Sequence, residues 1–496
     1  MSVVVPLPEE LRTFIARPAP ETMIVRGLPG TGKTSLALTL LDGFAGQKIY
    51  VTSRVPSTKL AHDFPWLGAG GNARITVVDA SRPGQITDTA HALEKIRELV
   101  AEAQGSPDTQ ALWVPPALQE AWSMAQPDRP AMVVVDSWDA IVEKYLGVPR
   151  SKGDVLPDRA EIERLVLDQL SRGPVHTVLV LEREGSSQLD YLVNGVVSTE
   201  RILVDGRPER WLHLHKLRGV RLDNASYPFT LESARFRCID PFRREFEPQF
   251  RLPEPEPSRV PGYIWPGSSD FATHLGRLPL GQISLFETET GVPDVAVRLV
   301  VGTVAVHVVQ SGGRVFTVLP PQTSPKLLRE IYRKAISDEE FRERVRMQTP
   351  DGTLTEDPDL RGVMMPLPRA ANEGGHARTP EAVRFLREGA KSGGANLTVV
   401  WIPGLNTMSA VTRVPYYPET LPAIALEYTV GTNAHEIFIG MTGDPLLESI
   451  RSLASTQFRF RARNGRVLLY GTQPVTPSFV LTQGNGSTNY RLLEVV

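Results

Sequence analysis

Eight consecutive residues, Gly27 to Thr34, have the types and the spacing of a loop that binds phosphate groups. Their sequence, GLPGTGKT, fits the pattern G-x-x-x-x-G-K-[ST] at every fixed position. Glycines let the backbone curl so that successive N–H groups face a phosphate chain, and the helix expected after the loop adds its positive N-terminal end. Lys33 would reach the β- and γ-phosphates, and the Thr34 hydroxyl would bind Mg²⁺. We therefore expect a nucleoside triphosphate to be contacted by Gly27, Leu28, Pro29, Gly30, Thr31, Gly32, Lys33, Thr34 and Ser35.

A second magnesium ligand is expected at the carboxyl end of a neighbouring buried strand. The segment MVVVDS places four apolar residues directly before Asp136. An aspartate that merely ends a strand is the simpler interpretation, but its pairing with the loop about a hundred residues upstream favours a metal-binding role. Asp139 is expected to cap a helix or to support the site from behind.

Phosphoryl transfer also needs positive charge beside the γ-phosphate, often supplied as an arginine by a neighbouring subunit. Lys216 and Arg218, in the segment HKLRG, are the candidates. Strand alternation would place both side chains on one face. The spacing alone favours a solvated strand edge for this pair.

The elements that must position these residues alternate between strand and helix in the first half of the chain. Strands are predicted at residues 23–25, 48–52, 75–78, 132–135 and 177–181. Helical patterns fall at residues 87–101 and 159–171. This order predicts a mostly parallel sheet with crossover helices. From Arg201 onward, an Asp-Gly turn between alternating runs predicts a β-hairpin.

The second half repeats this plan faintly. After a stretch rich in proline and charge, residues 241–262, strand signals return in GQISLFE, at residues 315–319 and at residues 397–402, and the end is again hairpin-like. We predict an α/β fold of tandem P-loop units, each with a parallel core and a hairpin-rich edge. The predicted domains are residues 1–240, a linker at 241–262, and a degenerate unit at 263–496.

Composition limits the classes of protein to which the chain can belong. A chain of 496 residues with 41% hydrophobic and 22% charged residues is expected to form two to four globular domains. A net charge of −2 gives no reason to expect nucleic acid or an anionic membrane as a partner. The arginine-rich stretches, including residues 342–346 and 459–466, are expected to be solvated faces paired with glutamate.

Compartment signals are consistent with a soluble, cytoplasmic protein. The single cysteine, Cys238, suits a reducing compartment and is expected to be a buried structural thiol. The first residues lack the pattern of a signal peptide. The longest apolar run, residues 295–309, is too short to span a bilayer.

Several segments together resemble the KaiC- and RadA-like branch of RecA-type ATPases. They are the loop, the VVVDS strand end, LDYLVNGVVSTE and especially LHKLRGVRLDNASYPFTLE, and they span most of residues 20–240. The stretch IYVTSRVPSTKLAHDFPWL also resembles the P-loop domain of the archaeal gas-vesicle regulator GvpD. The resemblance implies an ATP- and Mg²⁺-binding protein that forms a homo-oligomeric ring. It also implies that Lys216 and Arg218 reach the nucleotide of the adjacent subunit.

One departure from this family concerns hydrolysis. KaiC-like ATPases place a pair of glutamates after the second strand, whereas this chain has Ser53 and Arg54 there. Without an acid to orient the attacking water, hydrolysis is expected to be slow. Glu182, which follows the strand TVLVL, could act as the base, although an ordinary solvent-facing strand end is the simpler interpretation. Arg54 could contact phosphate or form a surface ion pair.

The second unit lacks the chemistry of the first. In the segment ETETGVPD, Pro293 and Asp294 stand where lysine and Ser/Thr belong. Glu287 and Glu289 would repel a triphosphate. The later strand LTVVWI lacks an aspartate, and the closing hairpin lacks KLRG. These losses predict a pseudo-ATPase unit retained for packing or for binding a protein partner.

Three functions remain open on the sequence. The favoured one is a regulatory ATPase whose nucleotide state controls assembly or partner binding. A DNA-dependent recombinase is opposed by the acidic balance and by the absence of a basic stripe with interleaved aromatic residues. A P-loop kinase would need a base beside an acceptor site, and Asp63 and Glu182 are the candidates for that base.

Overall fold

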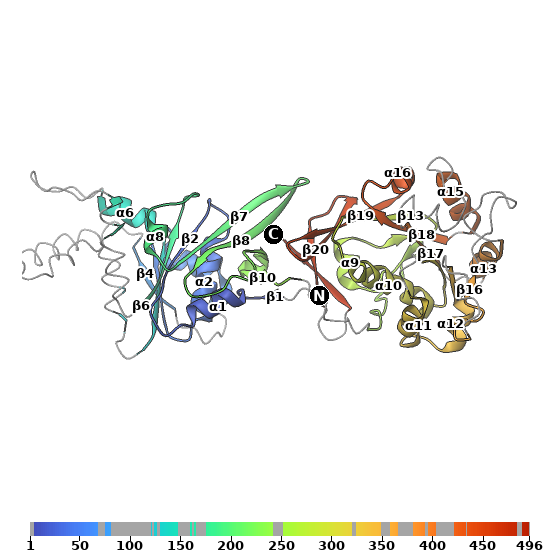
Figure 1. Cartoon of the computed structure of the whole chain (residues 1–496), viewed down its shortest axis with the longest axis horizontal. Helices are drawn as coiled ribbons and strands as arrows, with labels where there is room; N and C mark the ends of the chain where they lie inside the picture. Colours follow the sequence, from blue (N-terminus) through green and yellow to red (C-terminus); the bar gives the residue numbers. More distant parts are fainter. Residues whose placement is uncertain are drawn as a thin grey trace, which may run out of the picture. The chain divides into compact units, whose positions relative to one another are not determined.

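A computed structural model of the chain divides into two compact units. The first is made chiefly of Val4–Asp240 and the second chiefly of Pro241–Glu494 (Figure 1). The residues described here are 4–67, 75–80, 121, 124–125, 129–146, 159–160, 163–164, 175–241, 251–319, 324–348, 358–365, 380–391, 395–402, 421–432, 434–483 and 489–495.

The N-terminal unit is built on a mixed sheet that has ten strands in the described part of the chain. From one edge to the other they are β4 (Ile75–Asp79), β3 (Gln47–Thr52), β5 (Ala131–Asp136), β6 (Val175–Leu181), β2 (Thr22–Arg26), β7 (Gly195–Val204), β8 (Arg207–Leu217), β9 (Ser226–Thr230), β10 (Arg237–Ile239) and β1 (Val4–Val5). Pairing is parallel from β4 to β7 and antiparallel from β7 to β1. Strand β6 is buried along its whole length, as expected for a parallel strand covered on both faces.

Helices cover both faces of this sheet. They are α1 (Glu9–Ile15), α2 (Lys33–Gly43), α3 (Ser57–Asp63), α6 (Trp138–Leu146) and α8 (Leu189–Leu192), with short 3₁₀ turns at Pro65–Leu67 and Glu232–Ala234. Strand alternation divides the core. On β5, Val134 packs in the cluster with α1 and α2, whereas Val133 and Val135 pack in the cluster with α6 and α8.

The C-terminal unit has a second mixed sheet, with ten strands among the described residues. Their order is β16 (Met364–Met365), β15 (Val345–Gln348), β14 (Arg314–Val318), β17 (Asn396–Ile402), β18 (Ala434–Met441), β13 (Ile283–Thr288), β19 (Thr456–Arg463), β20 (Arg466–Gln473), β21 (Phe479–Gln483) and β22 (Tyr490–Glu494). Its helices are α9 (Ser269–His274), α10 (Asp294–Gln310), α11 (Pro325–Arg333), α12 (Asp338–Arg344), α13 (Pro380–Lys391), α15 (Leu421–Thr432) and α16 (Pro445–Arg451). Strands β11 (Tyr263–Ile264) and β12 (Leu278–Pro279) pair separately.

The two sheets share one strand order. When β2 is matched with β13, the run β4-β3-β5-β6-β2-β7-β8-β9-β10 corresponds to β15-β14-β17-β18-β13-β19-β20-β21-β22. In both sheets pairing is parallel as far as the strand after the central one, and antiparallel beyond it. The predicted fold class, tandem α/β units with a parallel core and a hairpin-rich edge, is confirmed.

Every strand predicted above is present within one or two residues of its expected bounds, and the Asp-Gly turn joins β7 to β8. The predicted helix at residues 87–101 lies outside the described residues. Of the helix expected at 159–171, only residues 159–160 and 163–164 are described. No described helix has the length and hydrophobicity that crossing a membrane would require.

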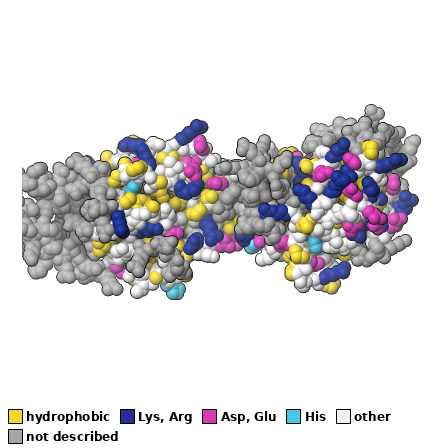
Figure 2. Space-filling model, turned by 90° about the horizontal axis from the view of Figure 1, so that it is seen from below, with side chains coloured by type: hydrophobic (Ala, Val, Ile, Leu, Met, Phe, Trp, Pro, Cys, Tyr) yellow, Lys and Arg dark blue, Asp and Glu magenta, His cyan; other side chains and the backbone are white. Residues whose placement is uncertain are grey.

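The surface prediction is wrong for one arginine-rich stretch. On the face that Figure 2 shows, basic and acidic side chains are interspersed. In residues 459–466, however, Arg466 is fully buried and Arg459 binds a buried carboxylate, so this stretch is not a solvated face.

Residues 242–250 of the predicted linker lie outside the described part of the chain. Beyond them, Glu254 donates its backbone N–H to Gly267 within the C-terminal unit.

Candidate nucleotide-binding site

The loop Gly27–Gly32 connects the central strand β2 to helix α2, and its shape depends on glycine. Gly27, Gly30 and Gly32 have φ angles of 153°, 76° and 99°. A Cβ atom at Gly27 would lie 2.3 Å from the backbone oxygen of Thr199, so only glycine fits there. The first turn of α2 carries no acidic residue. The loop therefore ends at a helix N-terminus that favours an anion.

Neighbouring strands hold the loop in place. The Thr31 hydroxyl donates to the backbone oxygen of Leu28 at 2.8 Å and lies 2.8 Å from the hydroxyl of Thr199 on β7. Arg210, on β8, donates from Nη1 to the backbone oxygen of Gly30 at 2.7 Å. The sequence motif gave no indication of Thr199 or Arg210, because their contact with the loop depends on how the hairpin packs.

Lys33 is the first residue of α2, and its side chain folds back over the loop. Its Nζ donates to the backbone oxygen of Leu28 at 2.8 Å, and the residue is 8% exposed. Burial lowers the pKa of Lys33, while the nearby carboxylates of Asp136 and Glu182 oppose that shift. The ammonium group lies where it could exchange the Leu28 carbonyl for a phosphate oxygen.

Thr34 and Asp136 meet at the start of α2 and the end of β5. The Thr34 hydroxyl donates to Oδ2 of Asp136 at 2.6 Å. Tyr50, from β3, donates its hydroxyl to the same oxygen at 2.7 Å. A hydroxyl and a carboxylate oxygen beside a phosphate loop form the oxygen donor set that Mg²⁺ prefers. The residues present therefore fit a magnesium ion, which Thr34 would bind directly and Asp136 through water.

Neither of the two residues after β3, Ser53 and Arg54, is acidic, and each has a hydrogen-bond or ion-pair partner in the structure. The Ser53 hydroxyl accepts the backbone N–H of Ser137 at 2.8 Å, which holds the segment after Asp136. Arg54 forms an ion pair of 2.7 Å with Glu182. Glu182 follows β6, and its backbone N–H donates to Asp139 at 2.7 Å. Both sequence candidates, Arg54 and Glu182, therefore lie together and partner each other.

The expected arrangement of Lys216 and Arg218 requires correction. Strand β8 ends at Leu217, so Arg218 lies beyond it, and an irregularity leaves His215 as an extra residue opposite β7. Because Arg218 lies past the end of the strand, alternation along β8 does not by itself place the two side chains on one face. Lys216 donates from Nζ to the backbone oxygens of Asp190 and Val193, at 2.9 and 2.7 Å, in its own chain. Arg218 is exposed.

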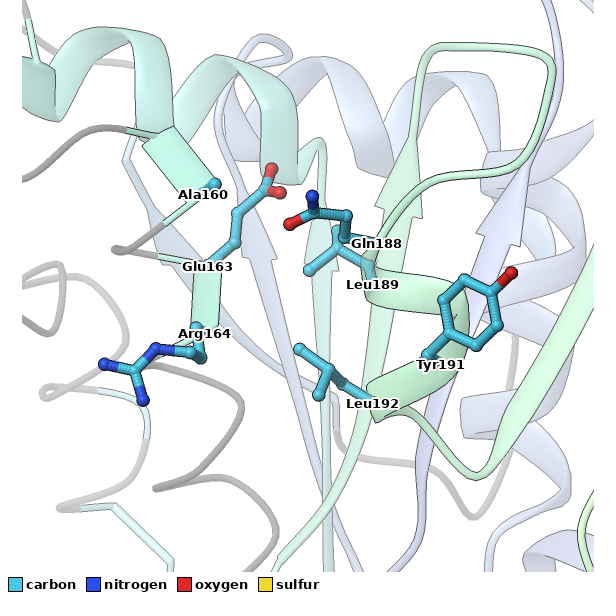
Figure 3. A pocket seen from close by; sticks show the side chains of 7 residues that line it. All are labelled: Ala160, Glu163, Arg164, Gln188, Leu189, Tyr191 and Leu192. Carbon is cyan, nitrogen blue, oxygen red and sulfur yellow. The ribbon is translucent and has the colours of Figure 1, made fainter.

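A cavity of about 460 Å³ lies beside α8. Its lining comes from two segments, with Ala160, Glu163 and Arg164 on one side and Gln188, Leu189, Tyr191 and Leu192 on the other (Figure 3). A chain of ion pairs and one hydrogen bond connects this cavity to Glu182, beside the phosphate loop. Glu163 and Asp139 both bind Arg159, and Asp139 accepts the backbone N–H of Glu182.

The candidate base for a kinase reaction, Asp63, lies at the end of α3 beside His62.

The corresponding region of the C-terminal unit differs in its charges. Glu287 is fully buried in β13, where it binds Arg451 of α16 and, at 2.9 Å, Arg459 of β19. Glu287 therefore lies in the strand and not in the loop, and the two arginines compensate its charge. This differs from the expectation above that it would repel a triphosphate. Glu289, in the loop, pairs with Arg461 at 3.5 Å. Pro293 is the N-cap of α10 and Asp294 its first residue, so they correspond to Gly32 and Lys33 and not, as expected above, to the lysine and the Ser/Thr.

The central strand, the glycine loop, the helix start and the Thr34–Asp136 contact define the N-terminal unit as a P-loop nucleotide-binding domain. Residues 11–215 match the family model described as "GvpD gas vesicle protein, P-loop domain". The N-terminal unit is thus similar to the P-loop domain of GvpD, as the sequence resemblance predicted. The resemblance to the KaiC- and RadA-like branch of RecA-type ATPases stays a prediction.

Two similar proteins come from Halobacterium salinarum (strain ATCC 700922 / JCM 11081 / NRC-1). Protein GvpD2 is 29% identical over 243 residues, which are 47% of this chain and 44% of that protein. Protein GvpD1 is 29% identical over 252 residues, which are 48% of this chain and 41% of that protein. The chain spans less than half the length of either relative.

Proposed function

We propose that this protein is a regulatory ATPase that binds Mg²⁺-ATP at the loop Gly27–Thr34. The observation that carries the proposal is the 2.6 Å contact between Thr34 and Asp136, beside a buried lysine at the start of α2. Lys33 would bind the β- and γ-phosphates, and Thr34 and Asp136 would hold the metal, Thr34 directly and Asp136 through water. Mg²⁺ supplies the positive charge that offsets the phosphates.

Hydrolysis at this site is slow. Orienting the attacking water is one of the few tasks left to the protein in phosphoryl transfer. The segment after β3 provides Ser53 and Arg54 rather than an acid, and Ser53 is occupied with Ser137. Glu182 is the remaining candidate for the base, and its ion pair with Arg54 must open before it can accept a proton.

Nucleotide occupancy controls the assembly of a homo-oligomeric ring or the grip on a protein partner. Arg218 is exposed and is the residue that would reach the nucleotide of an adjacent subunit. Lys216 would first have to leave the two carbonyl oxygens that it binds in its own chain. Binding energy available only in the assembled state would then favour assembly when ATP is present.

The C-terminal unit acts as a pseudo-ATPase that contributes packing or a partner surface. Its strand order matches that of the first unit, but Pro293 and Asp294 open α10 where Gly32 and Lys33 open α2, so the P-loop lysine is missing. The match to the GvpD P-loop family supports a regulatory role related to gas-vesicle proteins. The similar proteins from Halobacterium salinarum support an archaeal source. The single cysteine, Cys238, is consistent with a cytoplasmic location.

The test is size-exclusion chromatography with light scattering, with and without Mg²⁺-ATP, while released phosphate is assayed. The proposal predicts a larger assembly with ATP, slow phosphate release, and loss of assembly in Lys33→Ala and Arg218→Ala. Arg221→Ala is the matched control, because Arg221 is 91% exposed and close in sequence. A protein that hydrolyses ATP rapidly as a monomer and is unaffected by Arg218→Ala would contradict the assembly mechanism.

A further inference from the structure

Tyr50 is a buried tyrosine whose hydroxyl ends at the candidate magnesium site. It lies on β3, directly opposite Val134 of β5, and it is 2% exposed. Its ring packs in the apolar cluster that also contains Leu36 and Leu40 of α2. The hydroxyl extends from this cluster to Oδ2 of Asp136 at 2.7 Å. Core packing therefore fixes the position of a hydrogen-bond donor beside the carboxylate.

Two donors converge on one oxygen of Asp136. Thr34 and Tyr50 both donate to Oδ2, at 2.6 and 2.7 Å. A carboxylate whose Oδ2 is held from two directions cannot rotate freely about its Cβ–Cγ bond, so the direction of Oδ1 is set as well. Oδ1 can then accept a hydrogen from a metal-bound water. Thr34 belongs to the nucleotide loop, whereas Tyr50 belongs to a neighbouring strand and holds Asp136 independently of that loop.

We propose that Tyr50 is a positioning residue that orients Asp136 for Mg²⁺, and so sets the Mg²⁺ dependence of nucleotide binding. This inference rests on the proposed function of the site. A tyrosine that only fills the core would contribute to stability and leave the Mg²⁺ dependence unchanged. A positioning tyrosine contributes to both, because the orientation of Asp136 matters only when a metal is bound.

The test compares Tyr50→Phe with Tyr227→Phe in the full chain. Tyr227 is a matched control because it is 3% exposed, belongs to the same apolar cluster and donates its hydroxyl to the carboxylate of Glu10 at 2.7 and 2.8 Å. Both variants keep the aromatic ring and lose a hydrogen bond to a carboxylate, which is half-buried in Asp136 and buried in Glu10. A fluorescent ATP analogue is titrated in excess Mg²⁺ and in EDTA, and melting temperatures are measured without nucleotide.

Tyr50→Phe is expected to weaken nucleotide binding in Mg²⁺ about tenfold, the size of effect that follows from losing a hydrogen bond to a charged group. Binding in EDTA is expected to stay within about twofold of the wild-type value. Tyr227→Phe is expected to lower the melting temperature but to bind like the wild type in both conditions. The Mg²⁺ concentration at half-saturation should rise in Tyr50→Phe alone.

Two results would overturn this inference and leave the proposed function intact, provided that the wild-type protein binds Mg²⁺-nucleotide. One is wild-type Mg²⁺ dependence in Tyr50→Phe. The other is an equal loss of affinity in Mg²⁺ and in EDTA, which would show a purely structural role. A wild-type protein that binds no nucleotide would overturn the proposed function together with this inference.

Discussion

The hydroxyl of Thr34 lies 2.6 Å from Oδ2 of Asp136, although 102 residues separate the two along the chain. One residue lies in the first turn of helix α2 and the other ends strand β5. The parallel core brings them together, because helix starts and strand ends meet at the carboxyl edge of such a sheet. This edge is also where Lys33, Arg54 and Glu182 lie close enough to influence one another.

Replacing Glu182 by glutamine tests whether it is the base for hydrolysis. Glutamine keeps the shape of the side chain but cannot accept the proton, so phosphate release should fall at least about tenfold. The dissociation constant of Mg²⁺-ATP should change less than about twofold. Glu184→Gln, at an exposed position two residues away, is the control. Equal phosphate release by wild-type and Glu182→Gln protein would exclude Glu182 as the base.

The charge cluster of the C-terminal unit can be tested through stability. Glu287→Gln removes the buried carboxylate shared by Arg451 and Arg459, and this should lower the free energy of unfolding by ~3 kcal/mol. Glu289→Gln affects a more exposed pair with Arg461 and should cost less than ~1 kcal/mol. Urea denaturation measures both values. Equal small losses would show that Glu287 contributes little to the fold.

A pH dependence of stability follows from His435 in β18. Burial lowers the pKa of His435 to about 4, and its Nδ1 lies 2.7 Å from the backbone oxygen of Pro279. Because the unfolded chain takes up a proton near pH 6.5 and the folded chain does not, the contribution of His435 is fully present above that pH. It falls progressively toward pH 4, by ~2 kcal/mol between pH 7.5 and 5.

The measurement is urea denaturation at these two pH values for wild-type protein and His435→Gln. Burial also lowers the pKa values of His176 and His307, so part of the pH dependence has the same sign and should remain in the variant. The difference between the two proteins isolates His435. An identical pH dependence in both would contradict the assignment.

The sequence predicted the parts of the site whose residue types and spacing are fixed by chemistry. The loop from Gly27 to Thr34 and the aspartate after a run of valines could be found because each follows a local pattern. Tyr50 could not, since a tyrosine in a buried strand has no distinguishing spacing, and its partner is 86 residues away. Only the assembled sheet shows which side chains meet.

Local patterns also failed where a strand ends and where a charge finds a distant partner. Lys216 and Arg218 were expected on one strand face, but β8 ends at Leu217, so Arg218 lies beyond the strand. Glu287 was expected to repel phosphate, whereas arginines far away in sequence neutralise it. Both errors come from tertiary contacts that a single stretch of sequence does not contain.

The most direct test of the central claim is the binding of a fluorescent ATP analogue to the full chain in Mg²⁺, compared among wild-type protein, Lys33→Ala and Lys48→Ala. Lys48 is the control, because its ammonium group binds the backbone oxygen of Asp42 on an exposed part of the surface. We predict saturable binding by wild-type and Lys48→Ala protein, and a loss of about a hundredfold or more in Lys33→Ala. Unchanged affinity in Lys33→Ala, or no binding by the wild type, would contradict the account.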